Sequence, residues 1–315
     1  MARPCRRVTS LQPSVDEYLS LRRHLGFKLE RDGYLLPDFA TYMEEAGTST
    51  VTIDLALAWA KQPADGSAGW WQARLSTVRN YVRYLHGIDP SHQIPPDGLL
   101  PGGSRRVAPH IYTEAEIFRL MSAAGAFGTD LRATTYTTLI GLLVTTGMRS
   151  GEAIRLDRSD IDWDEGILFI RLTKYGKSRE LVLAPTTVDA LRRYDGVRRM
   201  WCPRPQTPAF FVSVLGARLL HRALNHAFCK LIQRAGLEPE AGTRRPRPHD
   251  LRHTFAVNTL VGWYRRGLEI NSKMYLLSTY LGHTNPTHTY WYLSSTPELL
   301  ALATNRLEAA QGDVS

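Results

Sequence analysis

A histidine and an arginine stand three residues apart in HDLRHTFA, at the start of a predicted helix. His249 and Arg252 therefore share one face of that helix, because residues three apart are neighbours on a helical surface. Two prolines leave the preceding chain extended, and Asp250 lies in the first turn. An imidazole and a guanidinium converging there favour a phosphate that undergoes proton transfer. A structural histidine bonded to the backbone is the alternative.

A second arginine lies at another predicted helix start. In TTGMRSGEAIRL, Arg149 follows a helix-ending glycine and precedes a helix opened by Ser150. The N-terminal end of a helix attracts anions, and Glu152, three residues on, could hold the guanidinium in place. Taken singly, a surface arginine in a loop is the commoner explanation.

Two lysines lie at the tip of a predicted β-hairpin. Residues 167–184, ILFIRLTKYGKSRELVLA, form two β-rich runs around a Tyr-Gly-Lys-Ser turn. Lys174 and Lys177 in this turn could deliver a proton to a departing oxygen. Lysines in turns are more often simply solvated.

The stretch LGHTNPTHTYWYL supplies a further histidine and two tyrosines. His283 follows a helix ending at Gly282, and a short helix then carries Tyr290 and Tyr292. Residues two apart cannot share a helical face, so only one of the two phenols can face a site. Core packing of both tyrosines is the alternative.

The elements that position these residues are predicted to be mainly α-helical, with one small β-hairpin. Residues 11–90 form helices, the first beginning with Ser14 and Glu17 as a capping box. A Pro/Gly-rich linker separates them from a second helical segment, in which Thr113 and Glu116 form another capping box. Residues 130–147 form an apolar helix that ends at a left-handed glycine. Further helices are expected near 186–199, 218–235, 249–266, 272–281 and 296–310.

Composition narrows the class of protein. The 315 residues carry a net charge of +9 with a pI of about 9.6, which favours a polyanionic partner, above all nucleic acid. No apolar run approaches membrane-spanning length, and the basic N-terminus has no apolar segment behind it. Three scattered cysteines indicate reduced thiols and a cytoplasmic protein.

Basic residues outside the candidate site are predicted to contact DNA. Arg74, Arg79 and Arg83 alternate with aromatic residues along one helix, which suits contacts with phosphates. A solvated basic helix face is the alternative. The other candidates for DNA contacts are Arg105, Arg106, Lys177, Arg179, Arg244, Arg245 and Arg247.

The order of these motifs resembles the tyrosine recombinases, the family of phage integrases and Xer-type recombinases. The resemblance covers residues 110–310 and, more weakly, the N-terminal helices. It implies a SAM-like core-binding domain at 1–94, a linker at 95–111 and a catalytic domain at 112–315. The nucleophilic tyrosine of that family stands nine residues after the LGH histidine. The implied catalytic residues are Arg149, Lys174, His249, Arg252, His283 and Tyr292.

The resemblance also implies a reaction. Arg149 and Arg252 would clamp the phosphate, His249 would accept the proton of Tyr292, and Lys174, with Lys177 in reserve, would protonate the 5′-oxygen. His283 would hydrogen-bond the phosphate. A 3′-phosphotyrosine link would form, strands would pass through a Holliday junction, and neither a cofactor nor a metal would be needed. The sequence around Tyr292 resembles that of recombinases encoded by mobile elements.

The implied partner is double-stranded DNA with specific sites, bound by a homotetramer, with no small-molecule substrate and no membrane. The C-terminal tail, from 297, is expected to dock on a neighbouring protomer or on its own domain. Three alternatives remain: a type IB topoisomerase, a non-catalytic DNA-binding regulator, and a metal-dependent nuclease using His249, His253 and His283.

Overall fold

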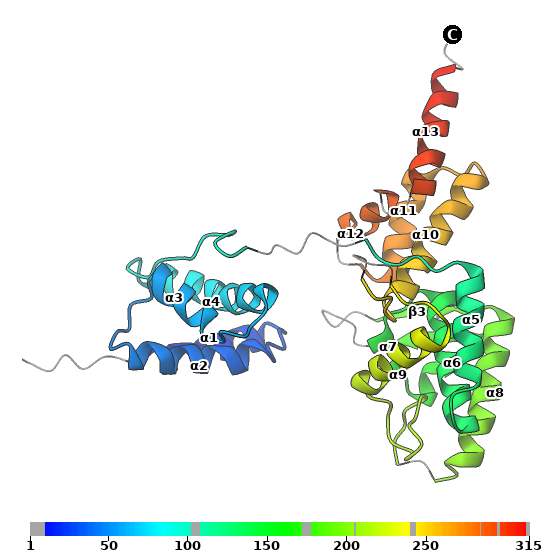
Figure 1. Cartoon of the computed structure of the whole chain (residues 1–315), viewed down its shortest axis with the longest axis horizontal. Coiled ribbons are helices and arrows are strands. Elements are labelled where there is room, and N and C mark those ends of the chain that lie inside the picture. Colours follow the sequence, from blue (N-terminus) through cyan, green and yellow to red (C-terminus); the bar gives the residue numbers. More distant parts are fainter. Residues whose placement is uncertain are drawn as a thin grey trace, which may run out of the picture. The chain divides into compact units, whose positions relative to one another are not determined.

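The structure is a computed structural model and describes residues 10–101, 108–171, 178–204, 206–239, 244–283, 285–294 and 297–312. The chain divides into two compact units, Met1–Arg106 and Val107–Ser315 (Figure 1). The expected linker at 95–111 overlaps this division, but residues 102–107 lie outside the described part. The roles given to the two domains stay predictions. No helix in the described ranges is long and apolar enough to cross a membrane.

The described part of the first unit, residues 10–101, is a bundle of four helices around its own apolar core. The helices are α1 (Gln12–His24), α2 (Asp32–Glu45), α3 (Ile53–Lys61) and α4 (Ala68–Ile88). Side-chain oxygens of Thr52 and Ser67 accept from backbone N–H groups at the starts of α3 and α4, which stabilises both helix starts. The capping box expected at Ser14 is wrong, because α1 already begins at Gln12 with a proline in its first turn.

In helix α4, two of the three arginines predicted to contact phosphates are buried. Arg74 is buried, with its guanidinium carbon 3.8 Å from the ring centroid of Trp59. Arg79 is also buried and donates from Nε to the carbonyl oxygen of Pro95 across 2.7 Å. Both side chains therefore hold the first unit together. Of the three, Arg83 is the one that a partner can reach, because its side chain is more than half exposed and its ion pair with Asp97 is long, at 4.0 Å.

The second unit is mostly helical with one small sheet. Its elements are α5 (Glu114–Gly125), α6 (Asp130–Thr146), α7 (Ser150–Arg155), the 3-10 helix η1 (Arg158–Asp160), β1 (Ile161–Asp162), β2 (Ile167–Ile170), β3 (Arg179–Val182), α8 (Pro185–Trp201), α9 (His221–Arg234), α10 (Asp250–Arg265), α11 (Ile270–Leu281), α12 (Thr287–Tyr290), the 3-10 helix η2 (Trp291–Ser294) and α13 (Pro297–Gly312). The antiparallel sheet has the order β1-β2-β3. The predicted hairpin strands, the later helices and the capping box of Thr113 and Glu116 are confirmed, whereas β1 was not foreseen.

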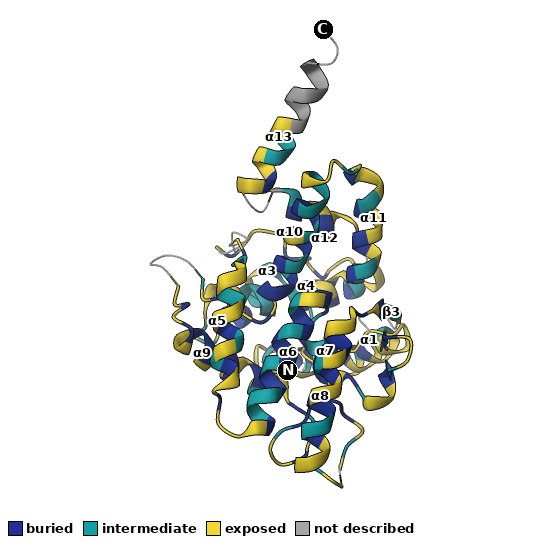
Figure 2. Cartoon of the chain, turned by 90° about the vertical axis from the view of Figure 1, so that its right-hand side faces the viewer, coloured by how far each residue is buried: buried dark blue, intermediate teal, exposed yellow. Residues whose placement is uncertain are grey.

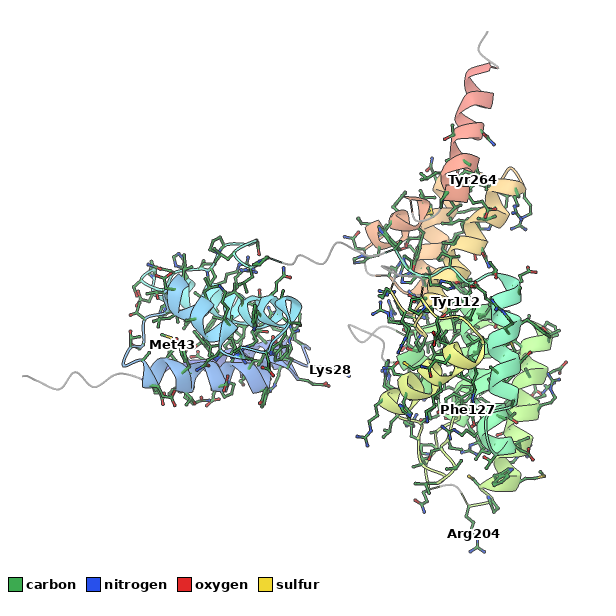
Figure 3. The ribbon with its side chains drawn as sticks, viewed as in Figure 1. Lys28, Met43, Tyr112, Phe127, Arg204 and Tyr264 are labelled. Carbon is green, nitrogen blue, oxygen red and sulfur yellow. The ribbon has the colours of Figure 1, made fainter. Side chains whose placement is uncertain are left out.

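Helix α6 occupies the centre of the second unit. It packs against α5, α8 and α10, and it carries buried residues along most of its length (Figure 2). A helix that is apolar on several faces can be stable only when neighbours cover those faces. Phe127, beside the start of α6, belongs to the same core, as does Tyr112 just before α5 (Figure 3).

The end of α6 is set by a glycine, as predicted. Gly147 has φ +60°, in the left-handed region. A Cβ atom built at this position would lie 2.3 Å from Cδ1 of Phe255 on α10. Glycine is therefore required both by the backbone conformation and by the close approach of α10, which brings Arg149 next to the start of that helix.

The C-terminal helix begins on its own unit. Leu299 is fully buried and joins the core of α10 and α11, and Arg265 of α10 forms a 2.7 Å ion pair with Glu298. The helix then extends away from the other helices of the unit (Figure 1). Packing in cis thus accounts for its first turn, and docking on a neighbouring protomer stays a prediction.

Candidate active site

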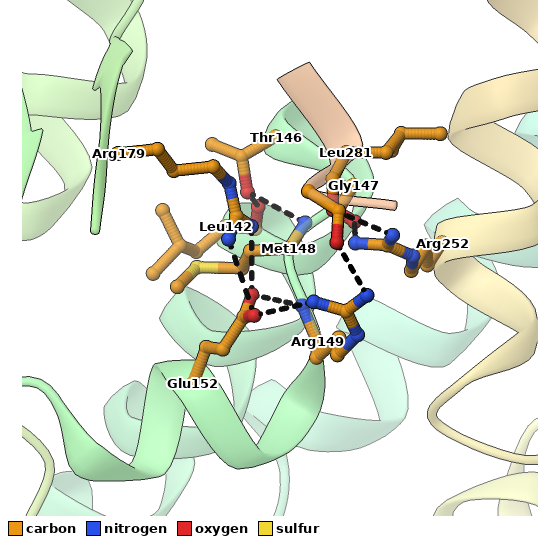
Figure 4. Close-up of polar contacts among 10 residues, drawn as sticks. Leu142, Thr146, Gly147, Met148, Arg149, Glu152, Arg179, Arg252 and Leu281 are labelled. Carbon is orange, nitrogen blue, oxygen red and sulfur yellow. Dashed lines mark hydrogen bonds and ion pairs between the residues drawn. The ribbon is translucent and has the colours of Figure 1, made fainter. Parts of the chain in front are cut away.

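Arg252 is the most deeply buried of the candidate residues, with 1% of its surface exposed. Its Nη1 donates to the carbonyl oxygen of Gly147 across 2.9 Å, and its Nη2 donates to that of Leu281 across 2.7 Å (Figure 4). Burial lowers the pKa of this guanidinium to about 10, and the charge of Arg149 adds to that effect. The group therefore stays protonated at neutral pH.

Arg149 approaches the same loop from the other side. It stands immediately before α7, and its Nη2 donates to the carbonyl oxygen of Gly282 across 2.9 Å. Its Nη1 forms a 2.8 Å ion pair with Glu152, which confirms the expected contact (Figure 4). The Arg149 side chain is about one-third exposed, so a ligand can reach it. Two guanidinium groups thus meet at the segment that follows α11.

Glu152 is a buried carboxylate shared by two arginines. It accepts from Arg149 and, across 2.8 Å, from Nη2 of Arg179 on β3. Burial by itself would raise the pKa of Glu152, but the hydrogen bonds and charge of Arg179, with the hydrogen bonds of Arg149, outweigh it and lower the pKa to about 2. Arg179 is therefore committed to an internal ion pair, which corrects its assignment as a DNA contact.

Two histidines lie at the start of α10. His249 is the residue before the helix, and its ring centroid lies 4.9 Å from that of His253, one turn later. Although solvent reaches His249, desolvation and then the charges of Arg252 and Arg149 lower its pKa to about 4. The imidazole is therefore neutral at physiological pH.

His283 lies where α11 ends. Gly282 closes that helix at φ +67°, and the Nδ1 atom of His283 is then 2.7 Å from Oγ1 of Thr289 on α12. Desolvation, followed by the charges of Arg252 and Arg149, lowers the pKa of His283 to about 3. The dependence of this pKa on both arginines indicates that the three side chains share one electrostatic environment.

The two tyrosines have opposite environments. Tyr292 is 2% exposed, whereas Tyr290 is 46% exposed. The Oη atom of Tyr292 lies 3.1 Å from Nδ1 of His253, and its ring centroid lies 6.3 Å from that of His283. Its phenol is also close enough to Arg252 to raise the pKa of that guanidinium. Tyr292 thus faces the arginines and histidines, and Tyr290 faces outward.

Sequence reasoning missed the position of His253. The sequence indicates that residue only as a possible metal ligand, four residues after His249. The same spacing places both imidazoles on one helix face, which is the signal that could have identified it.

Not all candidate residues belong to the described part of the chain. Lys174, Lys177, Arg105 and Arg106 are outside the described residues. Arg244 forms a 2.7 Å ion pair with the buried carboxylate of Asp250, which opens α10. Arg245 and Arg247 are exposed beside it. Within the described ranges, no group of three histidine, cysteine or acidic side chains is arranged to hold a metal ion.

Comparison with known proteins identifies the family. Residues 111–298 match the phage integrase family, so the chain belongs to that family. The "putative integrase/recombinase y4rB" of Sinorhizobium fredii is 41% identical over 96% of this chain and 98% of its own length. The tyrosine recombinase XerC of Actinobacillus pleuropneumoniae is 29% identical over 70% of this chain and 65% of its own length.

Solved structures show the same fold. The Tn1549 transposon integrase in complex with transposon right end DNA has a TM-score of 0.65 at 17% identity, covering 94% of this chain and 98% of that one. The XerH recombinase bound to a palindromic difH substrate has a TM-score of 0.63 at 19% identity, covering 87% and 78%. Together with the family match and the similarity to XerC, this makes the chain a tyrosine-type site-specific recombinase.

Proposed function

We propose that this recombinase cleaves double-stranded DNA with Tyr292 and forms a 3′-phosphotyrosine link. Attack of the phenol oxygen on phosphorus breaks the bond to the 5′-oxygen and leaves a 5′-hydroxyl. The link keeps the free energy of the phosphodiester, so rejoining requires no ATP. The observation that carries the proposal is the position of the buried Tyr292 hydroxyl among Arg252, His253 and His283.

The arrangement suits phosphoryl transfer because the main obstacle is the negative charge of the diester. Arg149 and Arg252 would neutralise the non-bridging oxygens by charge-assisted hydrogen bonds. His249 and His283, both neutral, would donate further hydrogen bonds to those oxygens. Lys174, or in reserve Lys177, would protonate the departing 5′-oxygen.

Part of the arginine donor capacity is already used. Arg252 donates to two carbonyl oxygens and Arg149 to one carbonyl and one carboxylate. Each guanidinium has five N–H donors, so each keeps donors that these bonds do not use. The bonds to the protein would hold the donors in place before DNA arrives, which lowers the reorganisation needed in the transition state.

The proposal includes an assembly and a biological setting. Two DNA sites would be held by a homotetramer, and exchange of successive strand pairs would pass through a Holliday junction. The reaction would integrate or excise a mobile element. The transposon integrase of similar fold and the putative integrase at 41% identity support this setting. Arg83, Arg245 and Arg247 are exposed candidates for contacts with the DNA backbone.

A nicked suicide substrate tests the proposal, because loss of the short strand beyond the nick traps a covalent intermediate. Nicked duplexes tiled across the DNA on both sides of the coding sequence would be incubated with the full chain and denatured. Wild type and Tyr290→Phe are expected to form an adduct, and Tyr292→Phe none. An adduct that persists in Tyr292→Phe and disappears in Tyr290→Phe would refute the assignment.

The same substrates separate this function from that of a type IB topoisomerase. A recombinase is expected to join DNA between two copies of the adduct-forming site and to leave unrelated supercoiled DNA unrelaxed. Relaxation of any supercoiled plasmid, with no joined product, would favour the topoisomerase reading.

A further inference from the structure

His253 lies between the helix start and the buried tyrosine. Its ring centroid is 4.9 Å from that of His249 and 5.4 Å from that of Tyr292. Its Nδ1 atom is 3.1 Å from the phenol oxygen, within hydrogen-bonding distance. Trp291 packs edge-on against the same imidazole, at 5.7 Å between centroids, and helps to fix the ring. The atom next to the reactive hydroxyl thus belongs to a residue outside the six that the family resemblance implies.

We propose that Nδ1 of His253, in place of the His249 imidazole to which the family resemblance gives this role, accepts the proton of the Tyr292 hydroxyl while that oxygen attacks phosphorus. This inference rests on the proposed function, because it concerns the same nucleophile. The bond between Oη and phosphorus forms, the bond between phosphorus and the 5′-oxygen breaks, and the phenol proton makes His253 an imidazolium. The proton needed by the 5′-oxygen comes from a separate acid. In the rejoining step, His253 returns its proton to Tyr292.

The electrostatic surroundings keep this imidazole in the form that can accept. Desolvation is the main cause that lowers the pKa of His253, to about 3, and neighbouring charges contribute further. The ring is therefore neutral at pH 7, with a lone pair on one nitrogen. The titratable and charged groups around it are His249, Arg252, Arg244, Arg247 and Tyr292.

Substrate binding would increase the basicity of His253. The positive charges of Arg252 and Arg247 oppose protonation of the ring. A bound phosphodiester supplies a compensating negative charge, so the imidazole becomes a stronger base when the nucleophile needs one. This order of events would keep Tyr292 protonated in the absence of DNA.

The proposal predicts a characteristic dependence of cleavage on pH. His253→Phe keeps a ring of similar size but has no acceptor nitrogen. Single-turnover adduct formation on the adduct-forming nicked duplex is expected to be nearly level for wild type between about pH 6 and pH 9. The variant should be about 100-fold slower near neutral pH, as for loss of a general base. Its rate should rise about tenfold per pH unit, because the phenolate fraction grows in this way below a pKa of about 10.

The slope separates proton acceptance from a structural role. A loss by the same factor at every pH would mean that His253 only supports the pocket, and the proposal would be wrong. Convergence of the His253→Phe rate with that of wild type at high pH would show that the variant is folded and binds DNA. His253→Asn can accept a hydrogen bond but is not a base, and should show the same slope. A level profile for this variant would also overturn the proposal.

The free chain allows a test that does not need DNA. With ¹⁵N-labelled histidine, the NMR spectrum is expected to show His253 with its proton on Nε2 and an unprotonated Nδ1 that shifts in Tyr292→Phe. A proton on Nδ1 would make the imidazole a donor to the phenol and would contradict the inference while leaving the proposed function intact. An adduct that persists in Tyr292→Phe would instead refute the proposed function.

Discussion

Arg252 and Leu281 are joined by a 2.7 Å hydrogen bond from Nη2 to the carbonyl oxygen at the end of α11. The same guanidinium binds the carbonyl of Gly147, at the end of α6. One buried side chain of α10 therefore ties together the ends of two other helices. The residue proposed to hold the phosphate also holds the pocket, so its loss should affect both stability and cleavage.

Replacement of Arg252 by lysine tests this double role. A lysine keeps the charge but lacks the planar fork that reaches both carbonyls. Arg252→Lys should lower the free energy of unfolding by about 1–3 kcal/mol, the cost of an unsatisfied buried polar group, and should reduce adduct formation strongly. Denaturant unfolding and the suicide substrate measure the two effects. The exposed Arg193→Lys serves as the control, and equal behaviour of both variants would contradict the prediction.

Glu152 should contribute stability that depends on pH. Its pKa falls from 4.5 to about 2 on folding, so its contribution is complete above about pH 4.5 and is lost as the pH falls through about 2. A shift of that size corresponds to about 3 kcal/mol. Glu152→Gln should therefore be less stable than wild type near neutral pH, and the difference should fade on acidification. Asp189, an exposed carboxylate that pairs with Arg192, provides the control. Asp189→Asn should show no such difference.

Gly147 should not tolerate a side chain. Gly147→Ala places a Cβ atom against Phe255 at a positive φ, which should cost about 1–3 kcal/mol of backbone strain and more for the clash. Gly267 has φ +65°, but no atom lies within 4 Å of a Cβ placed there. Gly267→Ala therefore introduces the backbone strain without the clash and should be less destabilising. Thermal unfolding of both variants measures the difference. Addition of Phe255→Leu to Gly147→Ala should restore part of the lost stability; no recovery would argue against the clash.

The start of α13 should stabilise its own unit. Leu299 is fully buried and the adjacent Leu300 is half exposed. Leu299→Ala should lower the free energy of unfolding by about 2–4 kcal/mol, whereas Leu300→Ala should change it by less than about 0.5 kcal/mol. Denaturant unfolding of dilute full-length chain tests both. If neither variant is destabilised, the cis packing of this helix contributes little in solution.

Much of the fold could be predicted because the signals are local. The capping box of Thr113 and Glu116, the left-handed Gly147 and the alternating strands of the hairpin depend on neighbouring residues. The helix start at Ser14 failed because a proline at position 13 can begin a helix one turn earlier than a capping side chain suggests. Strand β1 was missed because two residues carry no periodic pattern.

Burial of charged side chains could not be predicted from local patterns. Nothing in the sequence distinguishes Arg74, Arg79 and Arg179 from solvated arginines. Each is nevertheless held by partners far along the chain. Distant carbonyls, carboxylates and aromatic rings become partners only after the elements pack. A guanidinium is stable in the interior only where such partners are present.

The sequence alone determined which residue types follow one another: an arginine after a helix-ending glycine, HDLRH, and a tyrosine nine residues after LGH. It also determined that Tyr290 and Tyr292 face different ways, because the helical repeat separates residues two apart. Only the tertiary structure decided which tyrosine is buried, and which histidine lies against its hydroxyl. That choice depends on how α10 and the segment after α11 approach each other. The loop before α7 binds both, because Arg149 donates to the carbonyl of Gly282 and Arg252 donates to that of Gly147, each more than a hundred positions away.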